Sequence, residues 1–223
     1  MADVKAFQEQ VKRGDLNGVQ IALAEDPGLL DAVNESGQSA FLLAKYYRQP
    51  AIAEYLLSLD PQLSIFDACV AGLTEGVLRE VDREPAVLEK HSPDGWTPLH
   101  LAAFFGHPEL AKGLLNHGAA IDSRSTNPMQ NTPLHAAAAG GNLALVRLLL
   151  ENGADANARQ HGGWSALHSA AQAGDLEMIE VLLVNGAQVN ARAENNQSPL
   201  DLALMHGKSD AAQLLEAAGA RLQ

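Results

Sequence analysis

Cysteine, aromatic side chains and positive charge are all scarce in this chain of 223 residues. Its single cysteine, Cys69, cannot form an internal disulfide, which fits a reducing compartment. No run of about 18 apolar residues is present, so the sequence offers no membrane-spanning helix. The first 15 residues carry scattered charges and no apolar core, unlike a signal peptide. We therefore expect a cytoplasmic protein that does not bind a membrane.

Basic residues number 15 and acidic residues 27, which gives a formal net charge of −12. The excess is not local, because residues 1–93 contain 8 basic and 15 acidic side chains and the rest of the chain contains 7 and 12. A nucleic-acid-binding surface needs a basic face. We therefore expect no nucleic-acid partner.

Motifs for catalysis and metal binding are missing as well. The segment His206-Gly207-Lys208-Ser209 ends like a phosphate-binding loop, but the first glycine of that motif would fall at Leu202. The sequence contains no H-E-x-x-H, no paired cysteines for zinc and no G-x-S-x-G turn. We expect no enzymatic activity and no cofactor.

What the chain does contain is a repeat. The phrase T-P-L-H, or a close variant of it, starts at Thr97, Thr132, Ser165 and Ser198, at intervals of 35, 33 and 33 residues. A Gly-Ala pair follows each copy about twenty residues later and keeps the same intervals, at 118–119, 153–154, 186–187 and 219–220. Two phrases that stay in phase indicate stacked structural repeats instead of one globular core.

Each phrase has the chemistry of a helix start. Thr or Ser caps a helix N-terminus, and the following proline suits the first helical position. Small pairs such as Ala102-Ala103 allow neighbouring helices to approach closely. Glycines such as Gly106 and Gly174 end this first helix, and a second helix follows, as in 143–150. One repeat is thus predicted to be two helices and a hairpin finger.

The phrase and its Gly-Ala partner resemble the ankyrin repeat family, in which T-P-L-H-x-A is followed by G-A-D-V-N. The resemblance implies an all-α solenoid of stacked helix-turn-helix repeats with short β-hairpin fingers, acting as a non-catalytic protein-binding scaffold. It also implies that His100, His135 and His168 form hydrogen bonds between adjacent repeats near the capping residue. They cannot share a metal, because about one repeat separates them, far more than the roughly 2 Å of a zinc–nitrogen bond.

The same frame, with a weaker phrase, extends to the N-terminus and predicts one ankyrin repeat domain over residues 1–223. The first and last repeats act as caps, and Lys5, Gln8, Glu9 and Lys12 supply a polar outer face at one end. In the third repeat Cys69 stands where others place alanine, so we expect a buried filler. The predicted repeats are 3–35, 36–63, 64–93, 94–128, 129–161, 162–194 and 195–223.

In the ankyrin family, partners usually contact the finger tips, the residue before the phrase and the exposed end of the first helix. Six of the ten aromatic residues fall at the last two positions: Tyr46, Tyr47, Trp96, Phe104, Phe105 and Trp164. Tryptophan and tyrosine dominate interface hot spots. We predict that these six residues form an aromatic stripe on the concave face and bind a partner protein. Alternatively, they are ordinary family features, and part of Phe104 or Phe105 packs under the next repeat.

The fingers offer two further candidates. Arg124, Arg159 and Arg192 occupy equivalent positions and should form a ladder, either of solvated charges or as a docking strip for an acidic partner segment. The finger 123–131 is two residues longer than its counterparts. Its Pro128 and Met129 either contact a partner or belong to a neutral insertion.

We therefore expect a monomeric interaction scaffold whose partner protein is unknown. One alternative is a regulatory or inhibitory subunit of a separate enzyme. Another is a substrate for hydroxylation at Asn157, since the sequence before it loosely resembles ankyrin segments that cytosolic hydroxylases modify, although Ala156 replaces a valine of that pattern.

Overall fold

The computed structural model describes residues 4–221, and these are mostly helical. Packing divides the chain into two compact units, residues 1–73 (unit 1) and residues 74–223 (unit 2). The division falls inside the predicted repeat 64–93. Among the described residues, the one β pairing is an isolated antiparallel bridge between Val33 and Ser39.

Unit 1 contains two helix pairs and a fifth helix, built on a small apolar core. Helix α1 packs on α2 and on α3, while α3 also packs on α4 and α5. Phe7 and Val11 of α1 and Phe41 of α3 are among the buried side chains. The helices are α1 (Val4–Arg13), α2 (Leu16–Glu25), α3 (Ala40–Tyr46), α4 (Pro50–Ser58) and α5 (Ile65–Ala71), with a 3-10 turn, η1 (Pro27–Leu30), after α2. The pairs α1–α2 and α3–α4 confirm that the weaker N-terminal pattern also encodes paired helices.

One cap residue was assigned to the wrong side of α1. Gln8 was predicted on the polar outer face, but it is buried, and its Nε2 donates to the carbonyl oxygen of Gln38 at 3.1 Å. This bond satisfies the amide inside the packed face of the helix, beside Phe7 and Val11. The prediction was wrong because a polar side chain can be buried when a backbone partner from another repeat is available.

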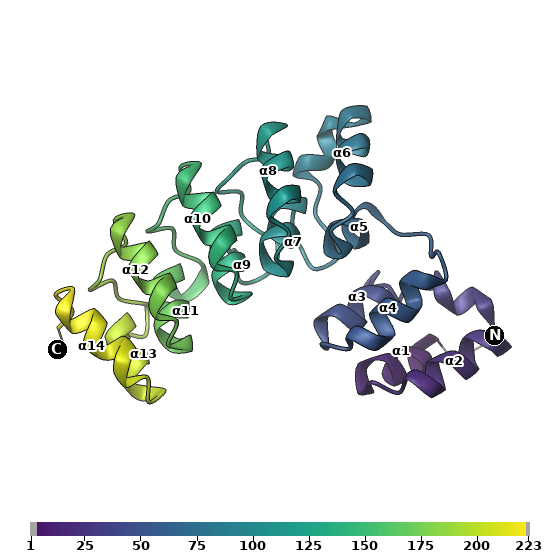
Figure 1. Ribbon diagram of the computed structural model, residues 1–223, viewed down its shortest axis with the longest axis horizontal. Coiled ribbons are helices and arrows are strands. Elements are labelled where there is room, and N and C mark those ends of the chain that lie inside the picture. Colours follow the sequence, from purple (N-terminus) through teal and green to yellow (C-terminus); the bar gives the residue numbers. More distant parts are fainter. Residues whose placement is uncertain (1–3, 222–223) are drawn as a thin grey trace. The chain divides into compact units, whose positions relative to one another are not determined.

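Unit 2 contains two layers of helices (Figure 1). The first helices of the repeats pack side by side in one layer: α7 (Pro98–Phe105), α9 (Pro133–Ala139), α11 (Ala166–Ala173) and α13 (Pro199–Met205). The second helices form the other layer: α6 (Thr74–Arg83), α8 (Pro108–Asn116), α10 (Leu143–Glu151), α12 (Leu176–Val184) and α14 (Ser209–Ala217). Short 3-10 turns, η2 (Pro85–Glu89) and η3 (His161–Gly163), lie in the connections.

Helix boundaries in unit 2 follow the predicted local signals. Thr97 and Ser198 are N-caps with capping boxes, and a proline stands at the first position of α7 and α13. Gly106 and Gly174 end α7 and α11 in the left-handed conformation, with φ of 81° and 77°. The pair Ala102-Ala103 is fully buried, as close packing of the first helices requires.

The fingers are tighter than the predicted β-hairpins. Each is a turn held by two backbone bonds, for example Ser92 N–H to Trp96 O at 2.8 Å and Gly95 N–H to Ser92 O at 2.8 Å. So few residues leave no room for a β-ladder. Neighbouring fingers are nevertheless joined, because Thr126 N–H donates to Gly95 O at 2.9 Å, His161 N–H to Met129 O at 2.8 Å and Glu194 N–H to Gly162 O at 2.8 Å. The result is a braced row of finger tips.

Candidate functional site

The phrase histidines are structural. His100 Nε2 lies 2.9 Å from the carbonyl oxygen of Asn131, in the next repeat, while its Nδ1 lies 2.8 Å from Thr97 Oγ1. A carbonyl oxygen only accepts, so Nε2 carries the proton and Nδ1 accepts from the threonine hydroxyl. His135 and His168 repeat this arrangement with Trp164 O at 3.0 Å and Gln197 O at 3.3 Å. The prediction of a link between adjacent repeats is confirmed.

Burial keeps these imidazoles neutral. It lowers the pKa of His100, His135 and His168 to about 4 in each case, because the charged form would lose its hydration. Within residues 4–221, no group of three or more His, Cys, Asp or Glu side chains is arranged to hold a metal ion.

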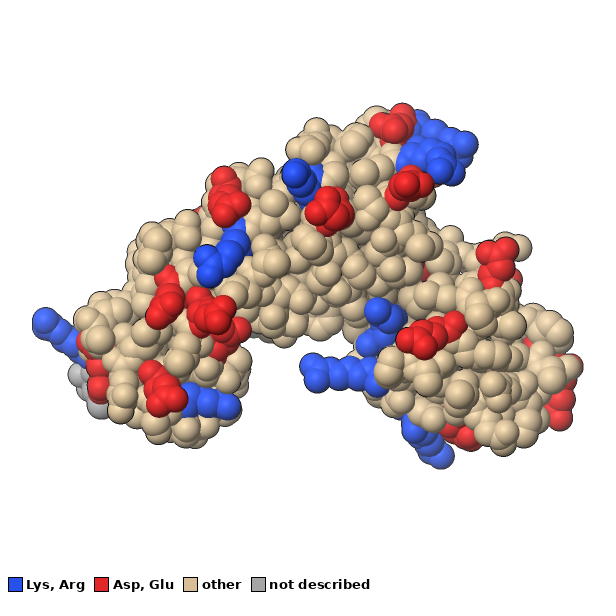
Figure 2. All heavy atoms as spheres, viewed as in Figure 1, with Lys and Arg blue, Asp and Glu red and all other residues tan. Residues whose placement is uncertain are grey.

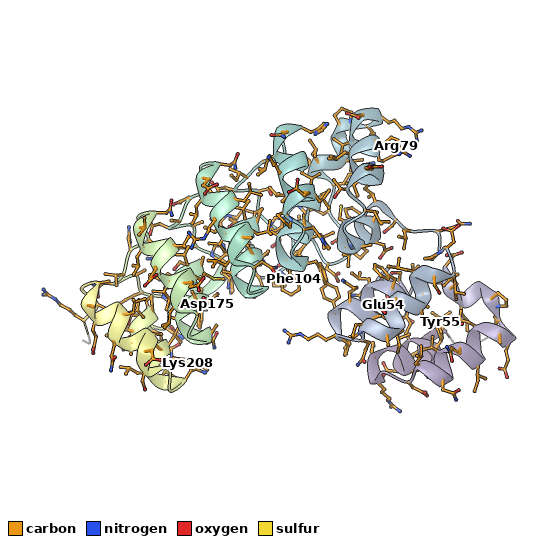
Figure 3. The ribbon with its side chains drawn as sticks, in the orientation of Figure 1. Glu54, Tyr55, Arg79, Phe104, Asp175 and Lys208 are labelled. Carbon is orange, nitrogen blue, oxygen red and sulfur yellow. The ribbon has the colours of Figure 1, made fainter. Side chains whose placement is uncertain are left out.

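In unit 2, the aromatic residues gather at the fingers and at the ends of first helices. Trp96 and Phe104 meet edge to face, with ring centroids 5.0 Å apart, and Phe104 meets Phe105 in the same way at 5.1 Å. Each of the three is half-buried. Figure 3 shows Phe104 at the C-terminal end of α7, on the side away from the second helices. The rings of this cluster pack on one another and still reach solvent, and the role of the two phenylalanines in binding stays a prediction.

Trp164 is the matching residue two repeats later. It is half-buried, its ring centroid lies 5.6 Å from that of His168, and its carbonyl oxygen accepts from His135. At the equivalent positions of the intervening repeat stand Asn131, which is buried, and two small exposed residues, Ala139 and Gly140. The aromatic groups of unit 2 are therefore separated by a repeat that has no aromatic side chain at these positions.

Tyr46 and Tyr47 belong to unit 1. Tyr46 is half-buried at the end of α3, and Tyr47 is 51% exposed. The Nζ atom of Lys12 lies 5.8 Å from the Tyr47 ring centroid and forms a 2.8 Å ion pair with Glu9. The continuous stripe that would join these tyrosines to Trp96 stays a prediction.

The arginine ladder links neighbouring fingers. Arg124 Nη1 donates to Gln130 O, at 2.9 Å in its own finger, and to Arg159 O in the next finger. Arg159 Nη1 likewise donates to Gly163 O at 3.1 Å and to Arg192 O at 2.5 Å. Arg124 and Arg159 are both exposed. These side chains are therefore anchored rather than freely solvated.

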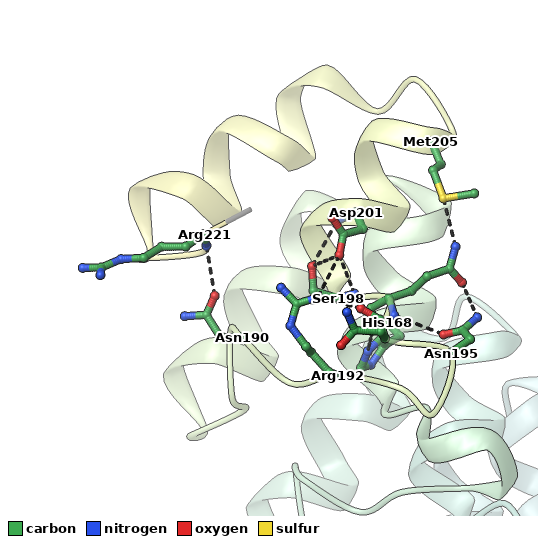
Figure 4. A network of polar contacts seen from close by, with 10 residues as sticks. His168, Asn190, Arg192, Asn195, Ser198, Asp201, Met205 and Arg221 are labelled. Atoms are coloured by element: carbon green, nitrogen blue, oxygen red, sulfur yellow. Dashed lines mark hydrogen bonds and ion pairs between the residues drawn. The ribbon is translucent and has the colours of Figure 1, made fainter. Parts of the chain in front are cut away.

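The third arginine ends the ladder differently. Arg192 Nη1 donates to Asn196 O at 2.6 Å and lies 3.4 Å from Asp201 Oδ2 (Figure 4). Asp201 replaces the phrase histidine, and its carboxylate accepts from Ser198. Burial alone would raise the pKa of Asp201, but the Ser198 bonds and the Arg192 charge lower it overall. Asp201 of the last repeat thus pairs with the finger arginine that precedes it.

The long finger is folded against the preceding one. Asn127 Nδ2 donates to Asp94 O at 3.0 Å, and Asn127 Oδ1 accepts from Ser125 Oγ and from Met129 N–H, each at 3.0 Å. Pro128 is exposed and Met129 is 48% exposed at the tip. The insertion is therefore braced, and its part in binding stays a prediction.

Two asparagines brace neighbouring repeats. Asn142 donates from Nδ2 to Ala103 O at 2.9 Å and to Phe104 O at 2.6 Å, which fixes the end of α7. Sequence reasoning missed this role, and no motif marks it. Asn157, the candidate hydroxylation site, donates to Gly186 O at 2.9 Å and accepts from Gln188 N–H at 2.8 Å. Its amide is thus engaged in a link to the next repeat.

Charge is mixed on the visible surface. On the face drawn in Figure 2, the Lys and Arg side chains of the described residues stand among acidic ones and form no continuous basic band. No helix in the stretch 4–221 has the length and apolarity to span a bilayer.

The paired helix layers and braced fingers of unit 2 define a helical repeat solenoid. Residues 65–160 and 152–223 match the family model of ankyrin repeats (3 copies). These matches span well over half of the sequence, and the chain belongs to the ankyrin repeat family. Ankyrin repeats are generally protein–protein interaction modules and are typically non-catalytic. No curated protein matches the chain. The total of seven repeats stays a prediction.

Proposed function

We propose that the chain is a non-catalytic scaffold that binds a partner protein through the aromatic residues of its fingers and first-helix ends. One observation carries this assignment. The aromatic residues between 74 and 221 are Trp96, Phe104, Phe105 and Trp164, and none of them belongs to the buried core.

The core of unit 2 does not need these rings. It is filled by leucine, valine, isoleucine, methionine and alanine side chains such as Leu134, Val146 and Ala137. Exposed aromatic clusters usually mark interaction sites. Rings held by edge-to-face contacts also lose little conformational freedom on binding, so less entropy opposes association. The proposal includes three further residues as partner contacts: Tyr46 and Tyr47 in unit 1, and Met129 at the tip of the long finger.

The test is affinity capture from the source organism's cytosol with the wild-type chain and the Trp96→Ala/Trp164→Ala variant. A protein retained by the wild type and lost by the variant supports the aromatic surface. Val184→Ala is the matched control, because Val184 is 87% exposed at the end of α12, in the second-helix layer. Equal capture by wild type and double variant would contradict the proposal, provided that circular dichroism shows all chains folded.

We propose that this scaffold works as a monomer in the cytoplasm. Regulation or inhibition of an enzyme is one form that such binding can take. It would appear in the same capture as a stoichiometric complex in which the partner's catalytic rate changes.

A further inference from the structure

The ladder arginines use only part of their hydrogen-bonding capacity. A guanidinium group carries five N–H donors. Arg124 and Arg159 each direct a single nitrogen, Nη1, to two carbonyl oxygens. For Nε and Nη2 of both residues, no hydrogen-bond partner is found among residues 4–221, and both side chains are exposed.

These unused donors are held in fixed positions. Each guanidinium is anchored both to its own finger and to the next, and backbone bonds between the fingers, such as His161 N–H to Met129 O, brace the row. A pre-positioned arginine loses less side-chain entropy when it binds. Its planar donor edge matches a carboxylate, which accepts two parallel N–H bonds.

Nearby acidic residues do not occupy these donors. Asp155 Oδ1 accepts from Asn157 N–H at 2.8 Å, and the Asp122 carboxylate accepts from Asp155 N–H at 3.3 Å. Of the three ladder arginines, Arg192 alone has a carboxylate partner among the described residues, Asp201. Arg124 and Arg159 therefore have donors free for a partner, whereas Arg192 is paired with Asp201 of the same chain.

Resting on the proposed function, we infer that Arg124 and Arg159 form the docking site for an acidic segment of the partner protein. The two arginines are one repeat step apart, about 10 Å for packed helices. A polyproline II segment with an acidic residue at every third position repeats its carboxylates at about 9.3 Å, from a rise of about 3.1 Å per residue. Such a segment places one carboxylate on each arginine.

The probe for this site is the peptide acetyl-(Glu-Pro-Pro)4-amide, titrated into the full chain and followed by isothermal calorimetry. The wild type binds it, and the (Gln-Pro-Pro)4 peptide binds at least about threefold more weakly, as the loss of exposed ion pairs predicts. Arg159→Gln weakens binding of the glutamate peptide by a similar factor. Arg192→Gln is the matched control: it also removes finger bonds, but its partner Asp201 already occupies that arginine, so the affinity stays unchanged.

Asp201→His provides a gain of binding. Histidine is the residue at the equivalent positions of the three preceding repeats, where it forms the same capping box. The substitution removes the carboxylate that faces Arg192 and extends the open ladder to three members, so the glutamate peptide binds more tightly. Equal binding of the glutamate and glutamine peptides, or an unchanged affinity in Arg159→Gln, would overturn the inference.

Failure of this inference is distinguishable from failure of the proposed function. The Trp96→Ala/Trp164→Ala variant keeps Arg124 and Arg159 and is expected to bind the peptide as the wild type does. Partner capture that depends on the tryptophans, with no binding of the peptide, would leave the aromatic surface standing and remove the acidic docking site.

Discussion

The Nε2 atom of His135 lies 3.0 Å from the carbonyl oxygen of Trp164, so a buried histidine of one repeat fixes the backbone of a surface aromatic residue in the next. His100 holds Asn131 in the same way at 2.9 Å. Interior bonds thus position the outer face. Stability and binding are expected to respond together when these histidines change.

His135→Ala is expected to lower the free energy of unfolding by about 1–3 kcal/mol, because the capping hydroxyl of Thr132 and the carbonyl of Trp164 lose a buried partner. Urea unfolding followed by circular dichroism measures the change. His161→Ala is the control, since this exposed side chain should alter stability by no more than about 0.5 kcal/mol. Equal stability of the two variants would contradict the structural role of His135.

Acidification should destabilise the fold before carboxylates titrate. The pKa of His100, His135 and His168 is lowered from 6.5 to about 4. The unfolded chain therefore binds more protons, and stability that is complete above about pH 6.5 is lost as the pH falls toward 4, by up to about 1.4 kcal/mol per histidine per pH unit.

Urea midpoints measured between pH 7 and 5, at about half-unit steps, test this dependence. The His135→Gln variant, with one titrating imidazole fewer, should show a shallower dependence by about one third. A flat profile for the wild type, or equal slopes for both chains, would count against neutral buried histidines.

Gly140→Ala should destabilise unit 2 by about 1–3 kcal/mol, because an added Cβ would collide with the Phe104 carbonyl oxygen and lie 2.6 Å from Asn142 Nδ2. Gly76→Ala in α6 is the matched change, since nothing lies within 4 Å of its added Cβ. Removing this helical glycine should stabilise the protein by about 0.5–1 kcal/mol. The pair is compared by urea unfolding, and a change of the same sign in both would refute the close approach at residue 140.

Cys69 should be unreactive in the folded protein. Burial raises the pKa of its thiol to about 12, with a further contribution from the charge of Asp67. A thiol-reactive dye at about pH 8 should label the chain only in denaturant, because the thiolate is the reacting species. Cys69→Ala provides the blank. Fast labelling of the native chain would contradict the buried position.

Local signals could be read from the sequence because each acts within a few residues. Thr97 and Pro98 start a helix, and Gly106 ends it, through their own backbone preferences. Gln8 shows where that reasoning failed, because its burial depends on a carbonyl group 30 residues away. Asn142 was missed for the same reason, since its partners are the backbone oxygens of Ala103 and Phe104.

For the candidate site too, the sequence predicted some features, and others depended on tertiary contacts. The positions of Trp96, Trp164 and the ladder arginines follow from the repeat period, which the sequence displays in full. The stacking of fingers about one repeat apart decides which nitrogen of each arginine is hydrogen-bonded. It also decides that Asp201 pairs with Arg192. By itself, the sequence determined the periodic helices and the family. The tertiary structure decided which polar groups remain open to a partner, because backbone carbonyls are alike in every residue and only packing selects among them.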